Sequence, residues 1–411
     1  MKRKFYIFNF IFIFSVLLSF ETGCTEKDLT KITTEPYPVR SEMIIDSGSK
    51  KINSKSAEEI VKDMGFGWNL GNTLDATVVL LNGGLSTETA WGMPKTTQAM
   101  IKDLKQKGIK TIRIPVSWHN HIINRQYTID PKWMLRVKEI VDWAIEEDMY
   151  VIINCHHDNN LIANTCNFGN GYYPAKKCSE ESKLFLSNIW FQICLAFNDG
   201  YDEHLIFETM NEPRLAALSN EWWFNEGDPS GTEAVKIINE YNQLILNVIR
   251  ASGGNNSERI VMFPSYAANP QLAMYQDFKV PQDSSENKLI LSAHMYTPYD
   301  FAMGEGRDKF DESVKNDLTA ILNGVKYKFQ DNGIPVVIGE MGATNKDNDK
   351  DREEWFSYFV STAKDYGMAC IVWDNMSPDN TQKSERYGFY DRRNLKWFFP
   401  EIIQAAIDAA K

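Results

Sequence analysis

Short apolar runs alternate with longer segments of helical periodicity along most of the chain. From about residue 54 onward, eight runs rich in β-branched and aromatic residues have the length of buried strands. These runs are GFGWNL, TIRIPV, YVIINC, LIFETM, RIVMFP, LILSAH, PVVIGE and CIVWDN. Helical spacing follows between them, for example over Thr97–Lys107, Pro131–Glu147, Thr232–Ala251 and Asp351–Tyr366. The pattern predicts eight strand–helix units.

Eight such units favour a (β/α)8 barrel, the TIM barrel of the α/β class, as one domain over residues 54–411. A doubly wound open sheet is the alternative architecture. Its first strand would usually be followed by a glycine-rich phosphate-binding turn, whereas this chain has GNTLDA there. The barrel is therefore the predicted fold, and function is expected on the loops after the strands.

The first residues have the pattern of an export signal. Residues 2–4 are Lys, Arg and Lys, and residues 5–20 form an apolar run that is short for a membrane span. Cys24 follows two small residues, as in bacterial lipoproteins, although Glu21 stands where those sites usually carry Leu. A lipid anchor on Cys24, simple secretion and an uncleaved anchor all remain open. Either way we expect an exported protein, secreted or anchored at the bacterial cell surface, with residues 25–53 as a flexible tether.

Composition narrows the range of partners. The formal charge of −11 and the pI of about 5.2 argue against nucleic acid, because phosphate binding needs a basic surface. The chain contains 11 Trp, which suggests stacking surfaces for the apolar faces of sugars.

The cysteines predict no structural metal site, since no CxxC or other zinc-binding spacing occurs. Cys166 and Cys178 bracket one loop, which favours a local disulfide in an exported chain. Cys155, Cys194 and Cys370 lie in apolar runs and are expected as buried thiols.

Polar and aromatic residues gather where the predicted strands end. In a barrel these ends share one rim, so the side chains should meet there. In chain order they are Asn69, Asn72, Arg113, Trp118, His156, His157, Asp158, Asn211, Glu212, His294, Tyr296, Glu340, Trp373, Asp374 and Asn375.

Two glutamates at this rim suggest a specific chemistry. Either Glu212 or Glu340 alone could be a solvated loop residue or an ion-pair partner. They follow the fourth and seventh strands, which face each other across a barrel mouth. A pair of carboxylates on opposite sides of a cleft is what glycoside hydrolysis requires.

The motifs around these glutamates resemble glycoside hydrolase family 5, a group of retaining (β/α)8 enzymes. NEP after the fourth strand, HMY after the sixth and GEMG after the seventh carry the resemblance to the family. WNLGNTLDA, ETAWGMPKTT, RIPVSWHNH and NEPR followed by EWW resemble its subfamily 4, which includes endoglucanases and xyloglucanases. The similarity extends from about residue 54 to the end of the chain.

The resemblance implies a role for each of several positions. Glu212 would be the acid/base, Glu340 the nucleophile, and Asn211 a partner of the sugar 2-hydroxyl. Arg113 and Tyr296 would hold Glu340. The remaining implied substrate contacts are Asn72, His156, His157, His294, Trp373 and, near the non-reducing side, Lys346.

A cation beside one glutamate lowers the pKa of that carboxyl group, while a less polar pocket keeps the other protonated. We therefore expect Glu340 to be ionised and Glu212 to carry the proton.

Loop tryptophans are candidates for sugar platforms. Trp91, Trp118, Trp222 and Trp223 all fall in predicted loops, and at least two should stack on sugars. The run NKDNDKD around Lys346 could equally cap a helix or form a weak calcium loop.

These observations predict a retaining endo-β-1,4-glucanase acting on cellulose-like, mixed-linkage or xyloglucan chains. A β-mannanase or other β-glycosidase on the same barrel, or a non-catalytic polysaccharide-binding protein, are the alternatives. HHD and HNH could hold a metal, but no metal-binding helix motif accompanies them. Two carboxylates and water suffice for the reaction, so we expect no cofactor or metal. We also expect a β-glucan as the partner and a monomeric protein.

Overall fold

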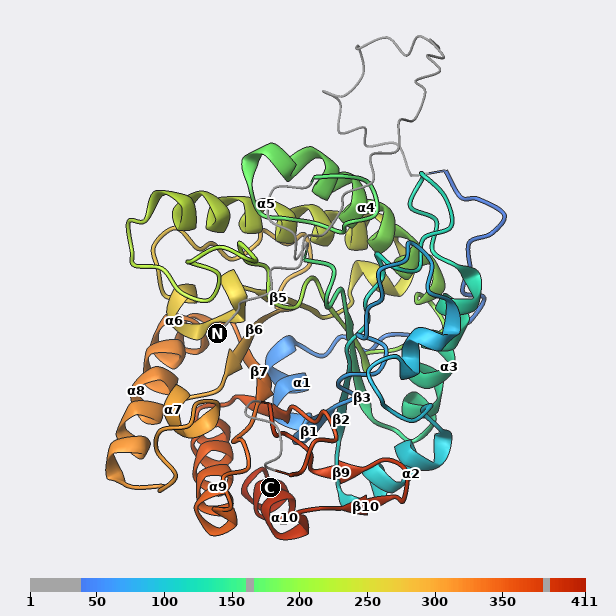
Figure 1. Ribbon diagram of the computed structural model, residues 1–411. Helices are drawn as coiled ribbons and strands as arrows, with labels where there is room; N and C mark the ends of the chain where they lie inside the picture. Colours follow the sequence, from blue (N-terminus) through green and yellow to red (C-terminus); the bar gives the residue numbers. More distant parts are fainter. Residues whose placement is uncertain (1–37, 160–165, 380–384) are drawn as a thin grey trace, which may run out of the picture. The chain divides into compact units, whose positions relative to one another are not determined.

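The computed structural model describes residues 38–159, 166–379 and 385–411. Its centre is a closed barrel of eight parallel strands in which β1 pairs with both β2 and β8 (Figure 1). The strands are β1 (Phe66–Asn69), β2 (Thr111–Ile114), β3 (Tyr150–Asn154), β4 (Leu205–Glu208), β5 (Val261–Pro264), β6 (Leu289–Met295), β7 (Val336–Met341) and β8 (Ala369–Val372). The predicted (β/α)8 barrel is confirmed, and each strand coincides with one of the eight predicted runs.

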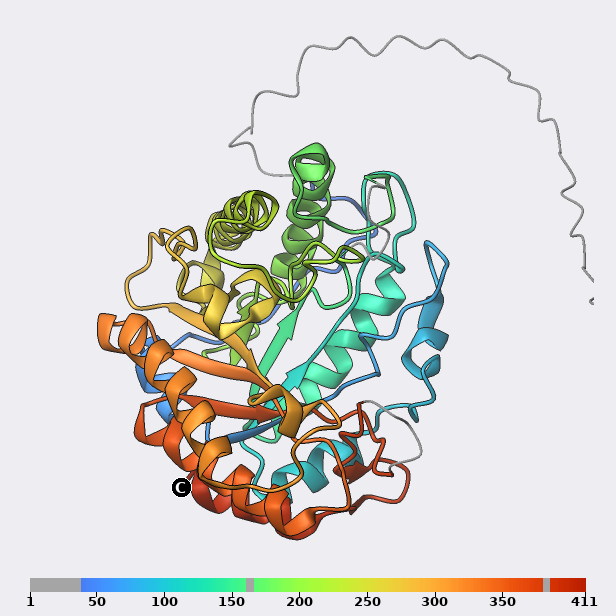
Figure 2. The same cartoon turned by 60° about the vertical axis from the view of Figure 1, so that its left-hand side comes forward.

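Helices surround the strands on the outside (Figure 2), except for the first one, which packs against the interior of the barrel. They are α1 (Ala57–Asp63), α2 (Gln98–Lys107), α3 (Pro131–Glu146), α4 (Ser179–Ala196), α5 (Pro229–Ala251), α6 (Pro270–Ala273), α7 (Tyr299–Ala302), α8 (Glu312–Lys328), α9 (Asp349–Asp365) and α10 (Pro400–Ala409). Short 3-10 helices span Gly84–Thr89, Lys176–Cys178, Gly254–Ser257, Tyr266–Ala268 and Gln330–Asn332. A hairpin of β9 (Tyr390–Asp391) and β10 (Lys396–Trp397) follows β8.

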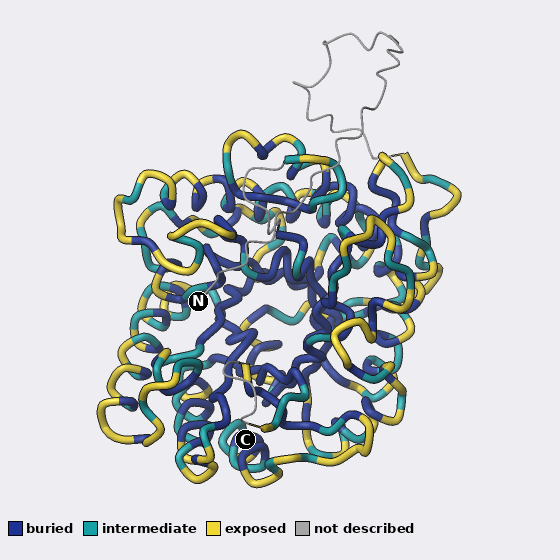
Figure 3. The backbone as a smooth tube through the Cα atoms, viewed as in Figure 1, coloured by how far each residue is buried: buried dark blue, intermediate teal, exposed yellow. Residues whose placement is uncertain are grey.

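The barrel interior has an apolar lower layer and a polar upper layer. Alternate residues of each strand point inward, and Ile152, Ile206 and Ile290 belong to one buried cluster there. Helix α1 completes that cluster with Ile60 and its neighbours. The centre of the molecule is correspondingly dark blue in Figure 3. One step further along the strands, the inward positions become polar, which places buried charge directly beneath the barrel mouth.

Residues 38–53 lie along the surface of the barrel. The backbone N–H of Asp46 donates to the carbonyl of Leu195 at 2.7 Å. The backbone N–H of Asn53 donates to the carboxylate of Glu203 at 3.0 Å. The prediction of a tether reaching residue 53 is therefore wrong for this segment, because these backbone groups find partners on the domain.

The predicted export signal and Cys24 lie outside the described residues. Within residues 38–159, 166–379 and 385–411, no helix combines the length and apolar character needed to cross a bilayer.

The cysteines follow the sequence prediction. A disulfide joins Cys166 and Cys178. Cys155, Cys194 and Cys370 are buried free thiols.

Candidate active site

Arg113 on β2 is the centre of a buried network beneath the barrel mouth. Its Nε donates to Glu208 Oε2 at 2.8 Å. Its Nη1 donates to Glu340 Oε1 at 2.8 Å and to Asn69 Oδ1 at 3.0 Å, and its Nη2 donates to Asn211 Oδ1 at 2.7 Å. The arginine is fully buried, and although burial lowers its pKa, the two carboxylates raise it further. A permanent cation therefore fixes one oxygen of Glu340 and one of Asn211.

Glu208 on β4 is a functional residue that the sequence prediction missed. It is buried, and it accepts further hydrogen bonds from Asn154 Nδ2 at 2.8 Å and Ser292 Oγ at 2.5 Å. The signal was available in the strand alternation, because Glu208 is two residues after the inward-facing Ile206. A carboxylate inside a barrel needs a cation, and Arg113 on β2 occupies the matching inward position.

Glu212 and Glu340 meet at the barrel mouth with His294 between them. Nδ1 of His294 lies 2.7 Å from Oε1 of Glu212 and 3.6 Å from Oε2 of Glu340. One carboxylate oxygen of each glutamate and a ring nitrogen of His294 all lie within 4.8 Å of one another. The Tyr296 hydroxyl donates to Oε2 of Glu340 at 2.9 Å. The sequence prediction that these carboxylates converge is therefore met by the geometry.

A register shift helps to place these side chains. The pairing of β6 with β7 shifts between Ala293 and His294, and beyond it His294 pairs with Glu340. Irregular pairing of this kind redirects side chains and is common beside active sites. Here it brings the imidazole alongside the carboxylate of the neighbouring strand.

The order of the two carboxyl pKa values is opposite to the sequence prediction. Burial raises the pKa of Glu340, and the lowering effects of His294 and Arg113 do not fully offset it. Burial also acts to raise the pKa of Glu212, but the hydrogen bond from His294 and the charge of Arg214 bring it below its ordinary value. The pKa of His294 is itself raised, since Glu340 and Glu212 outweigh its burial. The prediction failed because it considered Arg113 but neither the burial of Glu340, which raises its pKa, nor the contact of His294 with Glu212, which lowers the pKa of Glu212.

The opposite wall of the mouth holds two histidines and two tryptophans. The His156 ring is buried and nearly parallel to Trp373, at 2° and 5.7 Å between ring centres. The His157 ring lies 5.4 Å from the Trp91 ring, and its Nε2 lies 3.6 Å from Oδ2 of Asp75. This wall combines flat apolar faces with polar edges, which suits a sugar ring.

Asn72 sits in the turn after β1, next to this wall. Its backbone is left-handed, with φ 57°, and its N–H donates to Oδ2 of Asp75 at 3.1 Å. The preceding Gly71 lies against Trp373, because a Cβ there would be 2.8 Å from the indole ring and 2.6 Å from the carbonyl of Asp374. The turn thus supports the position of the Trp373 ring.

Among the residues that the structure describes, two groups of side chains have donor atoms close enough to hold a cation. One consists of Asp75, His156 and His157, and the other of Glu212, His294 and Glu340. In each group the donor atoms lie within 4.8 Å of one another. The second group is also the carboxylate pair, so a cation there would compete with acid–base chemistry.

Comparison with known proteins identifies the family. The model of the cellulase family, glycosyl hydrolase family 5, matches residues 76–379. The chain belongs to glycosyl hydrolase family 5. Endoglucanase A of Clostridium longisporum is 43% identical over 371 residues, which cover 87% of this chain and 66% of that relative, so the chain spans just under two thirds of its length.

Solved structures of family 5 agree with the fold. A lichenase of this family from Caldicellulosiruptor sp. F32, solved as a mutant with cellotetraose, has a TM-score of 0.81 and 39% identity. The comparison covers 90% of this chain and 100% of the lichenase. A subfamily 4 broad-specificity endoglucanase from Ruminococcus champanellensis, solved with cellotriose, has a TM-score of 0.79 and 41% identity over 87% of this chain and 99% of its own. The chain is thus a glycoside hydrolase of family 5, subfamily 4.

Trp118 does not fit the role predicted for it in this family 5 site. The ring is fully buried, and its Nε1 donates to the carbonyl of Asn154 at 2.9 Å. The prediction of a sugar platform is wrong because the loop after β2 turns this side chain into the core. Trp91, Trp222 and Trp223 remain 39%, 53% and 43% exposed.

Lys346 also departs from its predicted substrate contact. Its Nζ donates to the carbonyls of Asp300, Phe301 and Arg307 at 2.6, 2.9 and 2.8 Å. An ammonium group has three donors, so all are occupied by loop carbonyls. Burial lowers the pKa of Lys346 to about 8. The lysine therefore holds the loops after β6 and β7 together instead of presenting its charge to a sugar.

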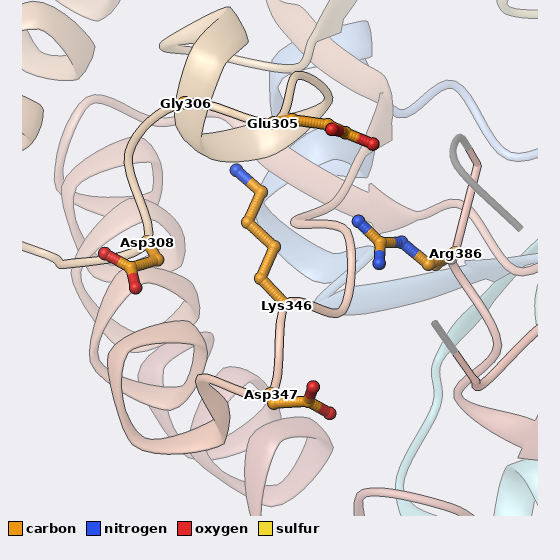
Figure 4. A pocket seen from close by; sticks show the side chains of 6 residues that line it. All are labelled: Glu305, Gly306, Asp308, Lys346, Asp347 and Arg386. Carbon is orange, nitrogen blue, oxygen red and sulfur yellow. The ribbon is translucent and has the colours of Figure 1, made fainter. Parts of the chain in front are cut away.

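The cavity beside Lys346 is polar. It measures about 390 Å³ and is lined by Glu305, Gly306, Asp308, Lys346, Asp347 and Arg386. Figure 4 shows the lysine extending toward Glu305 and Gly306, with the Arg386 guanidinium beside it.

Proposed function

We propose that the protein is a retaining endo-β-1,4-glucanase in which Glu212 is the acid/base and Glu340 the nucleophile. The observation that carries this proposal is the approach of the two carboxylates to within 4.8 Å, oxygen to oxygen. Retaining glycosidases hold their carboxyl groups about 5–5.5 Å apart, whereas inverting enzymes need about 6.5–9.5 Å to admit a water molecule. The spacing favours retention.

The assignment of roles follows from the hydrogen bonds of each acid. Glu340 accepts from Arg113 and Tyr296, so both oxygens are oriented and its negative charge is matched by a cation. A carboxylate held in this way can attack the anomeric carbon. Within the described part of the chain, Glu212 has no such fixed donor pair, and its carboxylate instead contacts the titratable His294. It is the acid better placed to gain and lose a proton.

The contact between His294 and Glu212 explains how an acid with a lowered pKa can still donate. A proton between the two groups forms either an ion pair or a neutral imidazole beside a neutral carboxyl group. Exclusion of water by a bound sugar disfavours the ion pair, because desolvation penalises charged forms. Substrate binding should therefore move the shared proton onto Glu212, ready for transfer to the leaving oxygen.

The reaction then takes two steps. In the first, Glu340 forms a covalent bond to the anomeric carbon while Glu212 protonates the departing glycosidic oxygen. In the second, Glu212 accepts a proton from water, the water attacks the same carbon, and the bond to Glu340 breaks. Each step inverts the carbon once, so the product retains the β configuration.

Other side chains of the mouth would bind the sugar at the reacting carbon. Arg113 occupies the oxygen of Asn211, which leaves the amide N–H group of Asn211 for the sugar 2-hydroxyl. Trp373 offers a ring face, and His156 and His157 offer polar edges on the same wall. Trp91 and Trp223 are exposed enough to stack on more distant sugars.

The substrate proposal rests on the names of the relatives. They are named lichenase and broad-specificity endoglucanase, and two were solved with cellotetraose and cellotriose. We infer that this chain acts on cellulose-like, mixed-linkage or xyloglucan chains. Comparing product release from carboxymethylcellulose, lichenan, xyloglucan and galactomannan tests this, and preferential hydrolysis of galactomannan would indicate a β-mannanase.

The catalytic assignment is tested by Glu340→Gln and Glu212→Gln on the preferred glucan. Both variants should lose turnover, while binding of a cello-oligosaccharide measured by calorimetry is kept. Full turnover by Glu340→Gln would remove the assignment. The partly exposed His204 directly precedes β4, at the end of that strand opposite the barrel mouth, and provides a control as His204→Gln.

The site of action is a separate proposal. The basic start and apolar run of residues 2–20 support export, and Cys24 supports a lipid anchor. Metabolic labelling with a fatty-acid analogue, compared between the full chain and Cys24→Ala, tests the anchor. Labelling that is unchanged by the substitution would exclude Cys24.

A further inference from the structure

Arg214 lies beside the acid/base carboxylate, and its charge contributes to the lowered pKa of Glu212. Its Nη1 donates to the backbone carbonyl of Glu212 at 3.0 Å and lies 3.8 Å from Oε2 of the same residue. The Arg214 side chain is only 9% exposed, so its charge acts through little water. A cation this close stabilises the ionised form of the Glu212 carboxyl group.

A second acid balances that cation. Nε of Arg214 donates to Oε1 of Glu221 at 3.0 Å, and the other oxygen of Glu221 accepts from the backbone N–H of Ala217 at 2.9 Å. Glu221 is thereby fixed by its own loop. The guanidinium is shared between two carboxylates, and its effect on Glu212 depends on how strongly Glu221 holds it.

An exposed indole covers the remaining face of the guanidinium. The ring of Trp222 lies 4.0 Å from the central carbon of Arg214, within the range of a cation–π contact. Trp222 is 53% exposed. The ring restricts the guanidinium to the plane in which it reaches both Glu212 and Glu221.

We propose that Arg214 is a positioning residue which, together with Glu221, sets the direction and proton affinity of the acid/base Glu212. This inference rests on the proposed function, because it assumes that Glu212 donates the proton. It assigns a purpose to the arginine that follows the NEP motif and to the glutamate that begins EWW.

Other charged and titratable groups also face Glu212. They are His294 and Tyr296 from the end of β6, Glu340 from β7, and His157 and Tyr172 from the loop after β3. Arg214 also acts on Tyr172 and on His156, but burial keeps the pKa of Tyr172 well above, and that of His156 well below, its ordinary value, so both rings stay neutral across the alkaline limb. A change in the pH profile of those variants can therefore be attributed to the Arg214–Glu221 pair.

The test measures the pH profile of kcat/KM on a cello-oligosaccharide, whose alkaline limb reports loss of the proton needed for acid catalysis. Arg214→Met removes a cation and should move that limb up by about one pH unit, as expected for an opposite charge within about 4–6 Å. Glu221→Gln frees the cation to act on Glu212 and should move the limb down. Arg214→Lys keeps the charge and should leave the limb near that of the wild type.

The decisive result is a shift of the alkaline limb in opposite directions in Arg214→Met and Glu221→Gln. Loss of structure alone would lower activity at every pH without moving the limb. Shifts of the same sign, or no shift in variants with wild-type melting temperatures, would overturn the inference. If Arg214→Met does not fold, Glu221→Gln and Arg214→Lys still decide it.

A substrate with an activated leaving group separates this inference from the proposed function. Dinitrophenyl β-cellobioside needs no proton for departure of its phenol. If Glu212 is the acid, Glu212→Gln should form the covalent intermediate from this substrate at nearly the wild-type rate while losing the cello-oligosaccharide. If Glu212→Gln does not form the intermediate from this substrate, the role of Glu212 is overturned. If it does, but the alkaline limb stays in place in the Arg214 and Glu221 variants, only the role of Arg214 is overturned.

Discussion

Nδ1 of His294 and Oε1 of Glu212 lie 2.7 Å apart, so an imidazole and a carboxyl group share one proton at the barrel mouth. The carboxylates raise the pKa of His294 above its ordinary 6.5, and the imidazole lowers that of Glu212 below its ordinary 4.5. The shared proton therefore leaves only as the pH rises through the raised pKa of the pair. Without the imidazole, Glu212 would hold that proton alone and lose it at lower pH.

His294→Gln should accordingly move the alkaline limb of kcat/KM to lower pH. The measurement is a pH–rate profile on a cello-oligosaccharide, with the acid limb followed in the same experiment. His204→Gln, a change at a partly exposed histidine away from the mouth, should leave both limbs in place. An alkaline limb that stays fixed or moves upward in His294→Gln would mean that the proton is not shared.

Glu208→Gln should reduce the free energy of unfolding by at least about 2 kcal/mol, because it removes one partner of a buried ion pair. Arg113 would keep Glu340 as its only carboxylate and draw it toward the vacated side. Urea denaturation measures the loss. Glu139→Gln, which removes the 51% exposed partner of Arg136, should change stability by no more than about 0.5 kcal/mol. Equal losses in the two variants would show that burial of the Glu208 pair is unimportant.

Gly71→Ala should lower kcat/KM roughly 10- to 100-fold, because small displacements of a positioned substrate are costly. The new Cβ would meet the Trp373 ring at 2.8 Å and the Asp374 carbonyl at 2.6 Å, so the ring must move. Steady-state kinetics on cellotetraose measure the change. Gly333 has a left-handed backbone and open space around it. As a control, Gly333→Ala should therefore lose stability without losing kcat/KM. Wild-type kinetics in Gly71→Ala would contradict the placement of Trp373 in the substrate site.

Trp118 and Trp223 should respond oppositely to substitution. Trp118→Phe leaves the carbonyl of Asn154 without its indole donor and should cost about 1–3 kcal/mol of stability with little change in KM. Trp223→Ala removes a 43% exposed ring and should weaken the binding of long cello-oligosaccharides by about 1 kcal/mol with little change in stability. Thermal melts and KM values for cellohexaose separate the two effects. A raised KM in Trp118→Phe would restore the platform role.

The barrel could be predicted because each of its strands is marked by a pattern within its own short stretch of sequence. Each strand appears as a short apolar run, and the position of Glu212 or Glu340 after such a run places it at the mouth. Glu208 could have been found in the same way, from its spacing to Ile206. The corrections concern features that depend on tertiary contacts. Nothing in the sequence around Trp118 shows that its loop folds inward.

The relative pKa values of Glu212 and Glu340 could be obtained only from the structure. Arg113 is visible as an unusual cation in an apolar strand, which suggested a lowered pKa for Glu340. The shift actually depends on how deeply each carboxyl group is buried and on the distance to His294, and a shifted strand register sets that distance. Similarly, the carbonyls that bind Lys346 come from loops about 40 residues away.

The central claim is that Glu340 forms a covalent bond with the sugar. Its most direct test is incubation with a 2-deoxy-2-fluoro-β-cellobioside carrying an activated leaving group, followed by mass spectrometry of the proteolytic peptides. Fluorine slows the second step, so the intermediate accumulates. We expect one fluorocellobiosyl group on Glu340 in the wild type and none in Glu340→Gln. A label on another residue, or turnover to the α product without any labelled peptide, would contradict the mechanism.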